Sequence, residues 1–341
     1  MCRLLTLLGL ALFVSTASAA GTTCKKGNVV HMSAAQPQYY FPSTWNENKT
    51  SPELAADQDC SWSVTVPSGY FAKIMIDGKM NGKDSRIQII DAVGNLLQMT
   101  HEKMEPYYFP SPKFTLVVSN DVAATFAFKI VWALMPSQTS GSFGVGSVPH
   151  LENATNTIYK NLYGTSDLLS LMVFPEDTHK TAQLRSVLVF EQLANSMNFI
   201  SNLEMIYKPR QQYISSVSSL ALINLEVTNT LDYYLVQEYD LVKNLGDYKV
   251  LECNPHSNCT ATVNGGSMPS GVVTAPHSNQ TLVDVEMDSN ANFSVYYGTI
   301  SNFGFDKKYT AAELKNALPI ACSWVSQYVV TSGKAVLRFL S

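Results

Sequence analysis

Residues 60–70 read Cys60-Ser61-Trp62-Ser63-Val64-Thr65-Val66-Pro67-Ser68-Gly69-Tyr70. Trp62, Val64 and Val66 alternate with small polar residues, so an extended segment would be apolar on one face and polar on the other. The Pro-Ser-Gly triplet at 67–69 then predicts a turn that ends the segment. The stretch therefore predicts a half-buried β-strand with a cysteine at its start.

The same alternation recurs on the C-terminal side of this strand. Apolar residues occupy every second position of four further segments, at 72–76, 87–89, 114–118 and 126–132. Turn signals such as Asp77-Gly78 and Gly94-Asn95 separate some of these segments at spacings of roughly ten residues. Short strands at this spacing predict an antiparallel β-sandwich over the first part of the chain.

The segment after this sandwich has the composition of a linker. Residues 136–149 are rich in Ser and Gly and have a proline at each end, which predicts a connection between two domains. We place a first domain at 20–135 and a second at 150–341. Alternating apolar residues predict strands in the second domain too, at 203–207, 221–227, 283–287 and 293–297.

One short helix is predicted in the second domain. Thr310 as N-cap and Glu313 three residues later form a capping box, and Pro319 ends the helix. After it, two strands at 328–330 and 335–340 are expected to form a hairpin through the turn at 331–334. The predicted fold class is therefore all-β, with an N-terminal sandwich followed by a β-rich domain that carries one short helix.

The first residues have the pattern of a secretory leader. Arg3 precedes an apolar run at 4–14, and Ala17-Ser18-Ala19 is a small-x-small cleavage site, which predicts a signal peptide at residues 1–19. A signal anchor is the alternative, but an apolar core of about 11 residues is shorter than the ~20 that a membrane span needs. Lys334 and Arg338 interrupt the C-terminal apolar run, so a lipid-anchor signal is not expected. We expect a secreted, extracellular protein that is soluble or peripherally attached to a membrane.

Composition limits the classes of partner. The 341 residues have a formal net charge of −4 and no cluster of basic residues, which argues against nucleic acid and against an anionic membrane. Charged residues make up 15% of the chain, below the ~25% of a typical soluble protein. This composition suits β-structure whose exposed faces are polar but uncharged.

The cysteines suggest a disulfide framework, and they are Cys2, Cys24, Cys60, Cys253, Cys259 and Cys322. Removal of the leader would leave five of them. We expect a Cys24–Cys60 bond, worth about 3 to 4 kcal/mol by loop entropy, and a Cys253–Cys259 bond across a turn. Cys322 is then a buried free thiol or an intermolecular bridge, although it could instead take Cys253 or Cys259. Without a CxxC pair, we expect no zinc site.

Five Asn-x-Ser/Thr acceptors are present, at Asn48, Asn153, Asn258, Asn279 and Asn292. In an exported chain they predict N-linked glycans on surface loops. Asn258 is the weakest of the five candidates, because a disulfide at the next residue, Cys259, would compete with glycosylation.

Two short sequences occur twice. Tyr-Tyr-Phe-Pro-Ser stands at 39–43 and again at 107–111, and Pro-His-Ser-Asn stands at 255–258 and again at 276–279. Clustered aromatic residues at loop tips would grip a sugar or another protein, whereas aromatic–proline segments also serve to cover a sandwich end. The second repeat either brings His256 and His277 together for a metal or forms two polar turns.

No catalytic motif is complete. HExxH, GxSxG, a Walker loop and GxGxxG are all absent from the sequence. Asp177-Thr178-His179 and Ser166-Asp167 supply the residue types of a Ser/His/Asp arrangement, but such residues are common enough for coincidence. We therefore expect no catalytic residue and no cofactor.

The strand that begins at Cys60, with Trp62, Pro67 and Tyr70, resembles the second-cysteine strand of CUB domains. Together with residues 37–45 and 126–132 it resembles the CUB-like domain proteins that are expanded in nematodes, over about residues 20–135. The later half resembles the companion region of the same proteins. The resemblance implies a jelly-roll β-sandwich, secretion, and association with innate immune and stress responses and sometimes with membrane rafts, without enzymatic activity or a defined ligand.

The sequence departs from ordinary CUB domains in two ways. No cysteine lies between Cys60 and Cys253, so the second CUB disulfide is missing. Asp84 and Asp121 fall near two of the three acidic positions of calcium-binding CUB domains, but Lys79 or Met80 occupies the remaining one. Two carboxylates are too few for a cation that takes six to eight oxygen ligands, so no metal site is expected.

We therefore expect a secreted, non-enzymatic CUB-like glycoprotein that binds an extracellular protein or glycan, including microbial surface material, in an innate immune or stress response. One alternative is a structural component of the extracellular matrix or of a gut-lining coat, which a covalent dimer through Cys322 would favour. The other is a secreted hydrolase, which requires a pocket in the second domain with a histidine beside an acid and a nucleophile.

Overall fold

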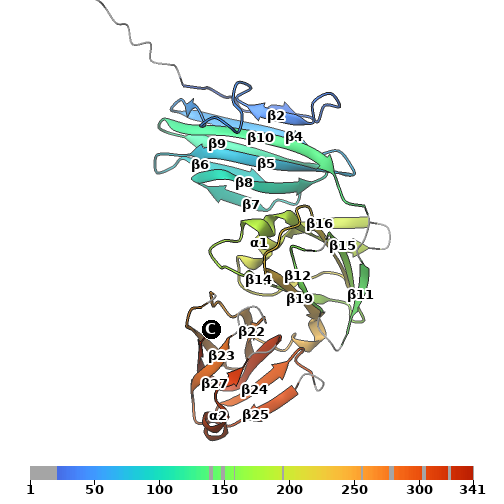
Figure 1. The fold of residues 1–341 in the computed structure, drawn as a ribbon, viewed down its shortest axis with the longest axis vertical. Helices are drawn as coiled ribbons and strands as arrows, with labels where there is room; N and C mark the ends of the chain where they lie inside the picture. Colours follow the sequence, from blue (N-terminus) through green and yellow to red (C-terminus); the bar gives the residue numbers. More distant parts are fainter. Residues whose placement is uncertain are drawn as a thin grey trace, which may run out of the picture.

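The computed structural model describes residues 21–137, 141–146, 150–156, 158–193, 196–254, 256–275, 280–301, 305–321 and 324–340. The signal peptide expected at 1–19 lies outside them. Within the described residues the chain is built of β-strands with two short α-helices, α1 (Leu203–Tyr207) and α2 (Ala311–Ala317). The expected all-β fold class is confirmed. Figure 1 shows the strands gathered into successive groups along the long axis of the molecule, in chain order.

The first unit, residues 21–137, is a sandwich of two five-stranded sheets. One sheet has the order β1 (Asn28–Val30), β4 (Gln58–Thr65), β9 (Lys113–Asn120), β6 (Arg86–Ile90), β7 (Leu96–Met99). The other has the order β2 (Gln38–Phe41), β10 (Ala124–Leu134), β5 (Tyr70–Lys79), β8 (His101–Pro110), and β3 (Glu53–Leu54) pairs with β10. The strand predicted from Trp62, Val64 and Val66 is β4 together with the residue that follows it.

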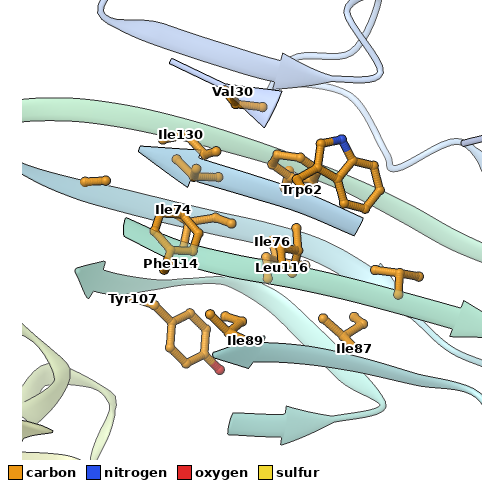
Figure 2. Close-up of a cluster of buried hydrophobic side chains, with 14 of the residues drawn as sticks. Val30, Trp62, Ile74, Ile76, Ile87, Ile89, Tyr107, Phe114, Leu116 and Ile130 are labelled. Atoms are coloured by element: carbon orange, nitrogen blue, oxygen red, sulfur yellow. The ribbon is translucent and has the colours of Figure 1, made fainter. Parts of the chain in front are cut away.

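The core between these sheets consists of the alternating apolar residues that the sequence marks. Trp62 is 1% exposed and its ring contacts the rings of Phe41 and Phe128 at centroid distances of 4.8 and 5.1 Å. Figure 2 shows Trp62 with Ile74, Ile76 and other residues of the same cluster, all pointing into the space between the sheets. Burying a side chain of this size contributes about 1.5–3 kcal/mol, so β4 anchors the unit.

A disulfide joins Cys24 to Cys60, with their Cα atoms 5.7 Å apart. Cys60 is fully buried in the core at the start of β4. The bond ties the segment before β1 to this strand, and β1 then runs parallel to β4, with Val30 opposite Val64. The covalent link and the ladder therefore fix the same two segments together.

The middle unit, residues 141–241, is also a sandwich. One sheet has the order β11 (Gly141–Val145), β13 (Tyr159–Gly164), β18 (Ser219–Asn224), β15 (Val187–Leu193), β16 (Ser196–Asn202). The other has the order β12 (His150–Asn153), β19 (Tyr233–Glu238), β14 (Leu169–Phe174), β17 (Tyr213–Ile214). Two 3₁₀ turns, Ala182–Ser186 and Tyr239–Leu241, complete the unit. Strand β11 lies inside the segment 136–149 that the sequence suggests as a linker.

The third unit, residues 247–340, is organised around β27 (Ser326–Leu340), which belongs to two sheets at once. Its first half pairs with β22 (Ser270–Thr274) and β24 (Asn292–Tyr297), and its second half pairs with β21 (Cys259–Gly265) and β23 (Thr281–Met287). The remaining strands lie at the edges: β20 (Asp247–Val250) beside β22, β25 (Phe305–Tyr309) beside β24, and β26 (Ile320–Ala321) beside β23.

Several strands of the second half are buried on both faces. In β14, Leu171 and Val173 face the core of the middle unit, while Met172 and Phe174 face a second core that the middle unit shares with the third. All six residues of β14 are buried. The middle and third sandwiches therefore meet through a common apolar layer. The domain division at 20–135, 136–149 and 150–341 stays a prediction.

Two local predictions are wrong. Residues 203–207 alternate as a strand would, but they form α1, because the Asn202 side chain caps the helix by accepting the Met205 N–H at 3.0 Å. Residues 328–340 form no hairpin, because β27 continues through the whole segment and changes sheet near Gly333, whose φ of +69° allows the corner. Helix α2 has the predicted capping box of Thr310 and Glu313.

Candidate functional site

The two copies of Tyr-Tyr-Phe-Pro-Ser lie on opposite edges of one sheet. The first copy overlaps the end of β2 and the second overlaps the end of β8, and these are the end strands in the order β2-β10-β5-β8. Both copies are therefore strands, not loop tips. Each places its second tyrosine opposite a lysine of the neighbouring strand, Tyr40 opposite Lys129 and Tyr108 opposite Lys73.

The β8 copy is covered by the middle unit. Tyr108 is 2% exposed and packs with apolar residues of β15 and β18, and burial raises its pKa well above the usual value. Lys73 lies 5.5 Å from the centre of the Tyr108 ring and forms an ion pair with Glu226. Figure 1 shows this edge of the first unit resting on the middle unit. This copy of the repeat is an internal contact between units.

Beside it, Arg185 of the middle unit reaches into the first unit. Its guanidinium lies 4.1 Å from the centre of the Tyr107 ring and contacts Glu102 and Glu204 at 3.4 and 3.1 Å. All of these side chains are largely buried. A buried cation between two carboxylates fixes the two units against each other.

The β2 copy has no strand on its outer side in the described part of the chain. Tyr39 and Phe41 point inward and pack against the core of the first unit, and burial raises the pKa of Tyr39. The alternation of a strand then places Gln38 and Tyr40 on the opposite face. Figure 1 shows β2 at the end of the molecule that is farthest from the third unit.

A groove of about 590 Å³ runs along this edge. Its lining consists of Ala35, Gln36, Pro37, Gln38, Tyr39, Tyr40 and Ser43. The lining residues are two tyrosines, two glutamines, a serine, an alanine and a proline, and none of them is charged. Tyr40 and Gln38 are the two whose side chains lie on the outer face of β2. Aromatic faces with amide and hydroxyl groups can stack on a sugar ring and exchange hydrogen bonds with its hydroxyls.

Neighbouring side chains hold the Tyr40 ring in place. Its hydroxyl donates to Gln38 Oε1 at 3.0 Å, Lys129 Nζ lies 5.4 Å from its centre, and the Trp45 ring meets it edge-on at 6.3 Å. Lys129 in turn forms a 2.6 Å ion pair with Glu47. This hydrogen bond lowers the pKa of Glu47, and it raises that of Lys129 although burial opposes the rise. A ring held in this way loses little entropy on binding.

The candidate calcium residues form no cluster. The Asp121 carboxylate accepts from the Ser85 hydroxyl, and the Asp84 carbonyl accepts from Arg86. Within the described ranges, no group of three or more His, Cys, Asp or Glu side chains could hold a metal ion. The absence of a metal site remains an expectation from the sequence.

The residues suggested for a hydrolase have other partners. The Asp177 carboxylate accepts the backbone N–H of His179 at 2.9 Å, and the Ser166 hydroxyl donates to Glu238 and to the Leu168 carbonyl. His179 and His256 are exposed, and His277 lies outside the described residues. Asp177 and His179 thus form a local turn, whereas Ser166 is bonded to Glu238 of β19, 72 residues further along the chain.

The remaining site predictions concern cysteines and glycans. Cys253 and Cys259 form a disulfide with Cα atoms 5.5 Å apart, while Cys322 and Asn279 lie outside the described residues. Asn48 and Asn258 are exposed, and Asn292 is partly buried on β24. Asn153 differs from these, because its Nδ2 donates to the Thr230 carbonyl at 2.6 Å.

The extent of the first unit coincides with a known domain. Residues 19–136 match the model of the CUB-like domain family. The match covers the first sandwich, the Cys24–Cys60 bond and both copies of the aromatic repeat, so the groove belongs to the CUB-like domain. None of the helices in the described ranges is long and apolar enough to cross a membrane.

Known proteins outside this family are at most distantly similar to the chain. No curated protein matches the chain. Similar solved structures include the CUB1-EGF-CUB2 domain of human MASP-1/3, with 8% identity over 59% of this chain and 98% of that chain and a TM-score of 0.24. The full extracellular region of zebrafish Gpr126/Adgrg6 has 9% identity over 94% of this chain and 53% of that chain, with a TM-score of 0.26. We draw no functional conclusion from similarities of this size.

Proposed function

We propose that the protein is a secreted, non-enzymatic recognition protein that binds neutral carbohydrate through the β2 groove of its CUB-like domain. The uncharged, aromatic and amide-rich lining of the groove is the observation that supports this function. Its uncharged lining combines the ring of Tyr40 with the amides of Gln36 and Gln38, and neutral sugars are recognised by such groups. The two disulfides fit an oxidising extracellular compartment.

The position of the groove supports the same function. The opposite edge of the sheet is covered by the middle unit, whereas the β2 edge lies at the far end of an elongated molecule (Figure 1). Pro37 and Pro42 flank β2, and proline limits the addition of a further strand at an edge. The β2 edge is therefore better suited to a ligand that binds side chains than to one that pairs with the backbone.

Recognition of microbial surfaces is the biological role that we propose for this binding. A carbohydrate-binding protein in the extracellular space would meet microbial surfaces, and the resemblance to nematode CUB-like proteins supports a role for such recognition in innate immune or stress responses. A structural role in a matrix or gut coat is the alternative. It predicts covalent dimers through Cys322, which a non-reducing gel of the exported protein would detect.

Co-sedimentation with insoluble neutral polysaccharides tests the binding function. The full chain is mixed with chitin, β-1,3-glucan, mannan and cellulose, and retention is measured against protein concentration. We expect binding to at least one of them. Gln38→Ala and Tyr40→Ala should each weaken binding by at least about tenfold, about 1.4 kcal/mol.

Gln88→Ala is the matched control. Gln88 lies on β6 of the other sheet and hydrogen bonds to Gln98 at 2.9 Å, away from the groove. This variant should bind like the wild type. Retention on none of the four polysaccharides, or retention that neither groove variant reduces, would contradict the proposed function.

A further inference from the structure

A second cleft lies where the third unit meets the segment 209–211 of the middle unit. Strand β27 passes from one sheet to the other and closes one side of this sandwich. On another side the sheets end in β20 and β21, and in the described part of the chain no ladder joins these two strands. The sandwich is therefore open between them.

The opening forms a cleft of about 610 Å³. Its apolar lining residues include Val250, Ala261 and Val272, and polar residues from β20, β21 and the segment 209–211 also line it. Thr260 and Thr262 on β21 are exposed there. The cleft thus has apolar atoms between two polar walls.

The backbone of β21 presents N–H and C=O groups to this cleft that no backbone group of the described residues pairs with. Asn264 lies opposite Lys334 of β27, but the N–H and C=O of Lys334 bond to Asp288 on the other side of β27. The Asn264 carbonyl instead accepts from the Ser270 hydroxyl at 2.7 Å, so it points away from β27. Along an antiparallel strand, the N–H and C=O groups of successive residues point alternately toward and away from the neighbouring strand. The groups of Thr262 and Thr260, two and four residues before Asn264, therefore also point away from β27.

On the opposite wall of the cleft, backbone groups of β20 are already paired with the segment 209–211. Gln211 forms a β-bridge with Lys249 of β20, and the Val250 N–H donates to the Arg210 carbonyl at 3.2 Å. The charged side chains on this wall are paired, Lys249 with Asp247 and Arg210 with Glu252. This wall therefore offers balanced charges, while β21 offers backbone hydrogen-bonding groups.

The β21 edge also lacks the usual protection against pairing. Exposed edge strands are commonly guarded by lysine or proline. Strand β25, which lies at the end of its sheet in the same unit, carries Lys307 and Lys308. Strand β21 has seven residues with neither proline nor a charged side chain. An unguarded edge of this length is available to another strand.

We propose that this cleft binds an extended polypeptide segment of a partner protein, which adds to β21 as a further strand. Thr260 and Thr262 repeat donor and acceptor at a spacing of about 6.8 Å, and an extended polypeptide backbone has the same spacing. Sugars and lipids have no such repeat. Alternate side chains of the segment contact the apolar lining, and the paired charges of the other wall favour a segment without net charge. This site is independent of the carbohydrate groove.

Peptide selection on the full chain tests the proposal. Random seven-residue peptides displayed on phage are selected on the wild type after depletion on Thr262→Pro. Proline removes the Thr262 N–H that faces the cleft and spares the ladder to β27, and edge strands tolerate proline at such positions. We expect enriched peptides with alternating apolar residues. As synthetic peptides they should bind Thr262→Pro at least tenfold more weakly, and Thr262→Val, which keeps the N–H, within threefold of the wild type.

Hydrogen exchange tests the same proposal on the wild type alone, without a substitution that could disturb the fold. A bound peptide should slow exchange at the Thr260 and Thr262 amides, and the same peptide with N-methyl groups on its strand-facing amides should not bind. The absence of any enriched peptide, or protection elsewhere than on β21, overturns the proposal. Self-association of the chain that Thr262→Pro abolishes also overturns it, because the edge would then belong to a second copy.

Discussion

Replacing Glu152 with glutamine should destabilise the middle unit in a way that depends on pH. Glu152 lies on β12, and its carboxylate accepts from His150 Nε2 and from Lys160 Nζ, each at 2.7 Å. Lys160 lies on β13 of the other sheet, so the pair ties the two sheets together. Burial opposes ionisation of Glu152, but the hydrogen bonds from His150 and Lys160 lower its pKa from 4.5 to about 2.

The size and sign of the effect follow from this lowered pKa. One pKa unit corresponds to about 1.4 kcal/mol, so the charged form of Glu152 contributes about 3 kcal/mol to folding. A carboxyl group whose folded-state pKa is lowered stabilises fully above its unfolded-state value near 4.5. The contribution is lost as the pH falls from there toward 2. The glutamine variant should therefore be less stable than the wild type at pH 7 and nearly equal to it at pH 2.

Urea unfolding at several pH values, followed by circular dichroism with the disulfides intact, measures this difference. We expect about 3 kcal/mol between wild type and Glu152→Gln at pH 7, shrinking steadily below pH 4.5. Glu286→Gln is the control, because Glu286 is 65% exposed beside Arg338 and exposed pairs contribute at most about 1 kcal/mol. A difference that stays constant from pH 7 to pH 2 would refute the assignment of the effect to the Glu152 charge.

Two further predictions concern the junction and the glycans. Arg185→Met should cost about 3 kcal/mol in the same urea assay, because it removes the cation that Glu102 contacts in the buried junction and leaves Glu204 with Lys208 at 3.7 Å, and a loss below about 1 kcal/mol would contradict the role of this cluster. Mass spectrometry of glycopeptides from the exported protein should find a glycan on Asn48, which is exposed, and none on Asn153, whose amide is bonded inside the fold. Occupancy of Asn153 would show that this hydrogen bond does not form.

The strands of the first sandwich are predictable because each has one buried face. In β4 and β9, buried residues alternate with partly exposed ones along almost the whole strand. The alternation of apolar and polar residues in the sequence therefore matches the alternation of buried and exposed side chains. The Cys24–Cys60 pair is part of the same arrangement, since Cys60 occupies a core position of β4.

The middle unit is less predictable for the same physical reason. All six residues of β14, and five of the six in β18, are buried, because neighbouring sheets or units cover both faces. In such strands both sets of alternate residues are buried, so the sequence cannot tell which set faces which core, even where apolar residues alternate as at 221–227. The apparent alternation at 203–207 predicts the wrong element, because the Asn202 cap selects a helix there.

The candidate site shows a different limit. The same five residues form an exposed groove edge at 39–43 and a buried junction at 107–111. Local sequence cannot distinguish them, because the second copy is covered by β15 and β18, which begin more than 70 residues further along the chain. Each copy even has a lysine opposite its second tyrosine, and each lysine forms an ion pair with a glutamate. The two copies differ in that Glu47 belongs to the first unit, whereas Glu226 belongs to the middle unit.

The free edges of this molecule differ in what they can bind. At β2, Pro37 and Pro42 restrict pairing through the backbone, and the groove offers rings and amides instead. At β21, the side chains are small and uncharged, and the backbone groups of Thr260 and Thr262 are the main recognition elements. The two sites share no lining residue, so one molecule would hold a carbohydrate surface at β2 and a polypeptide partner at β21 at the same time.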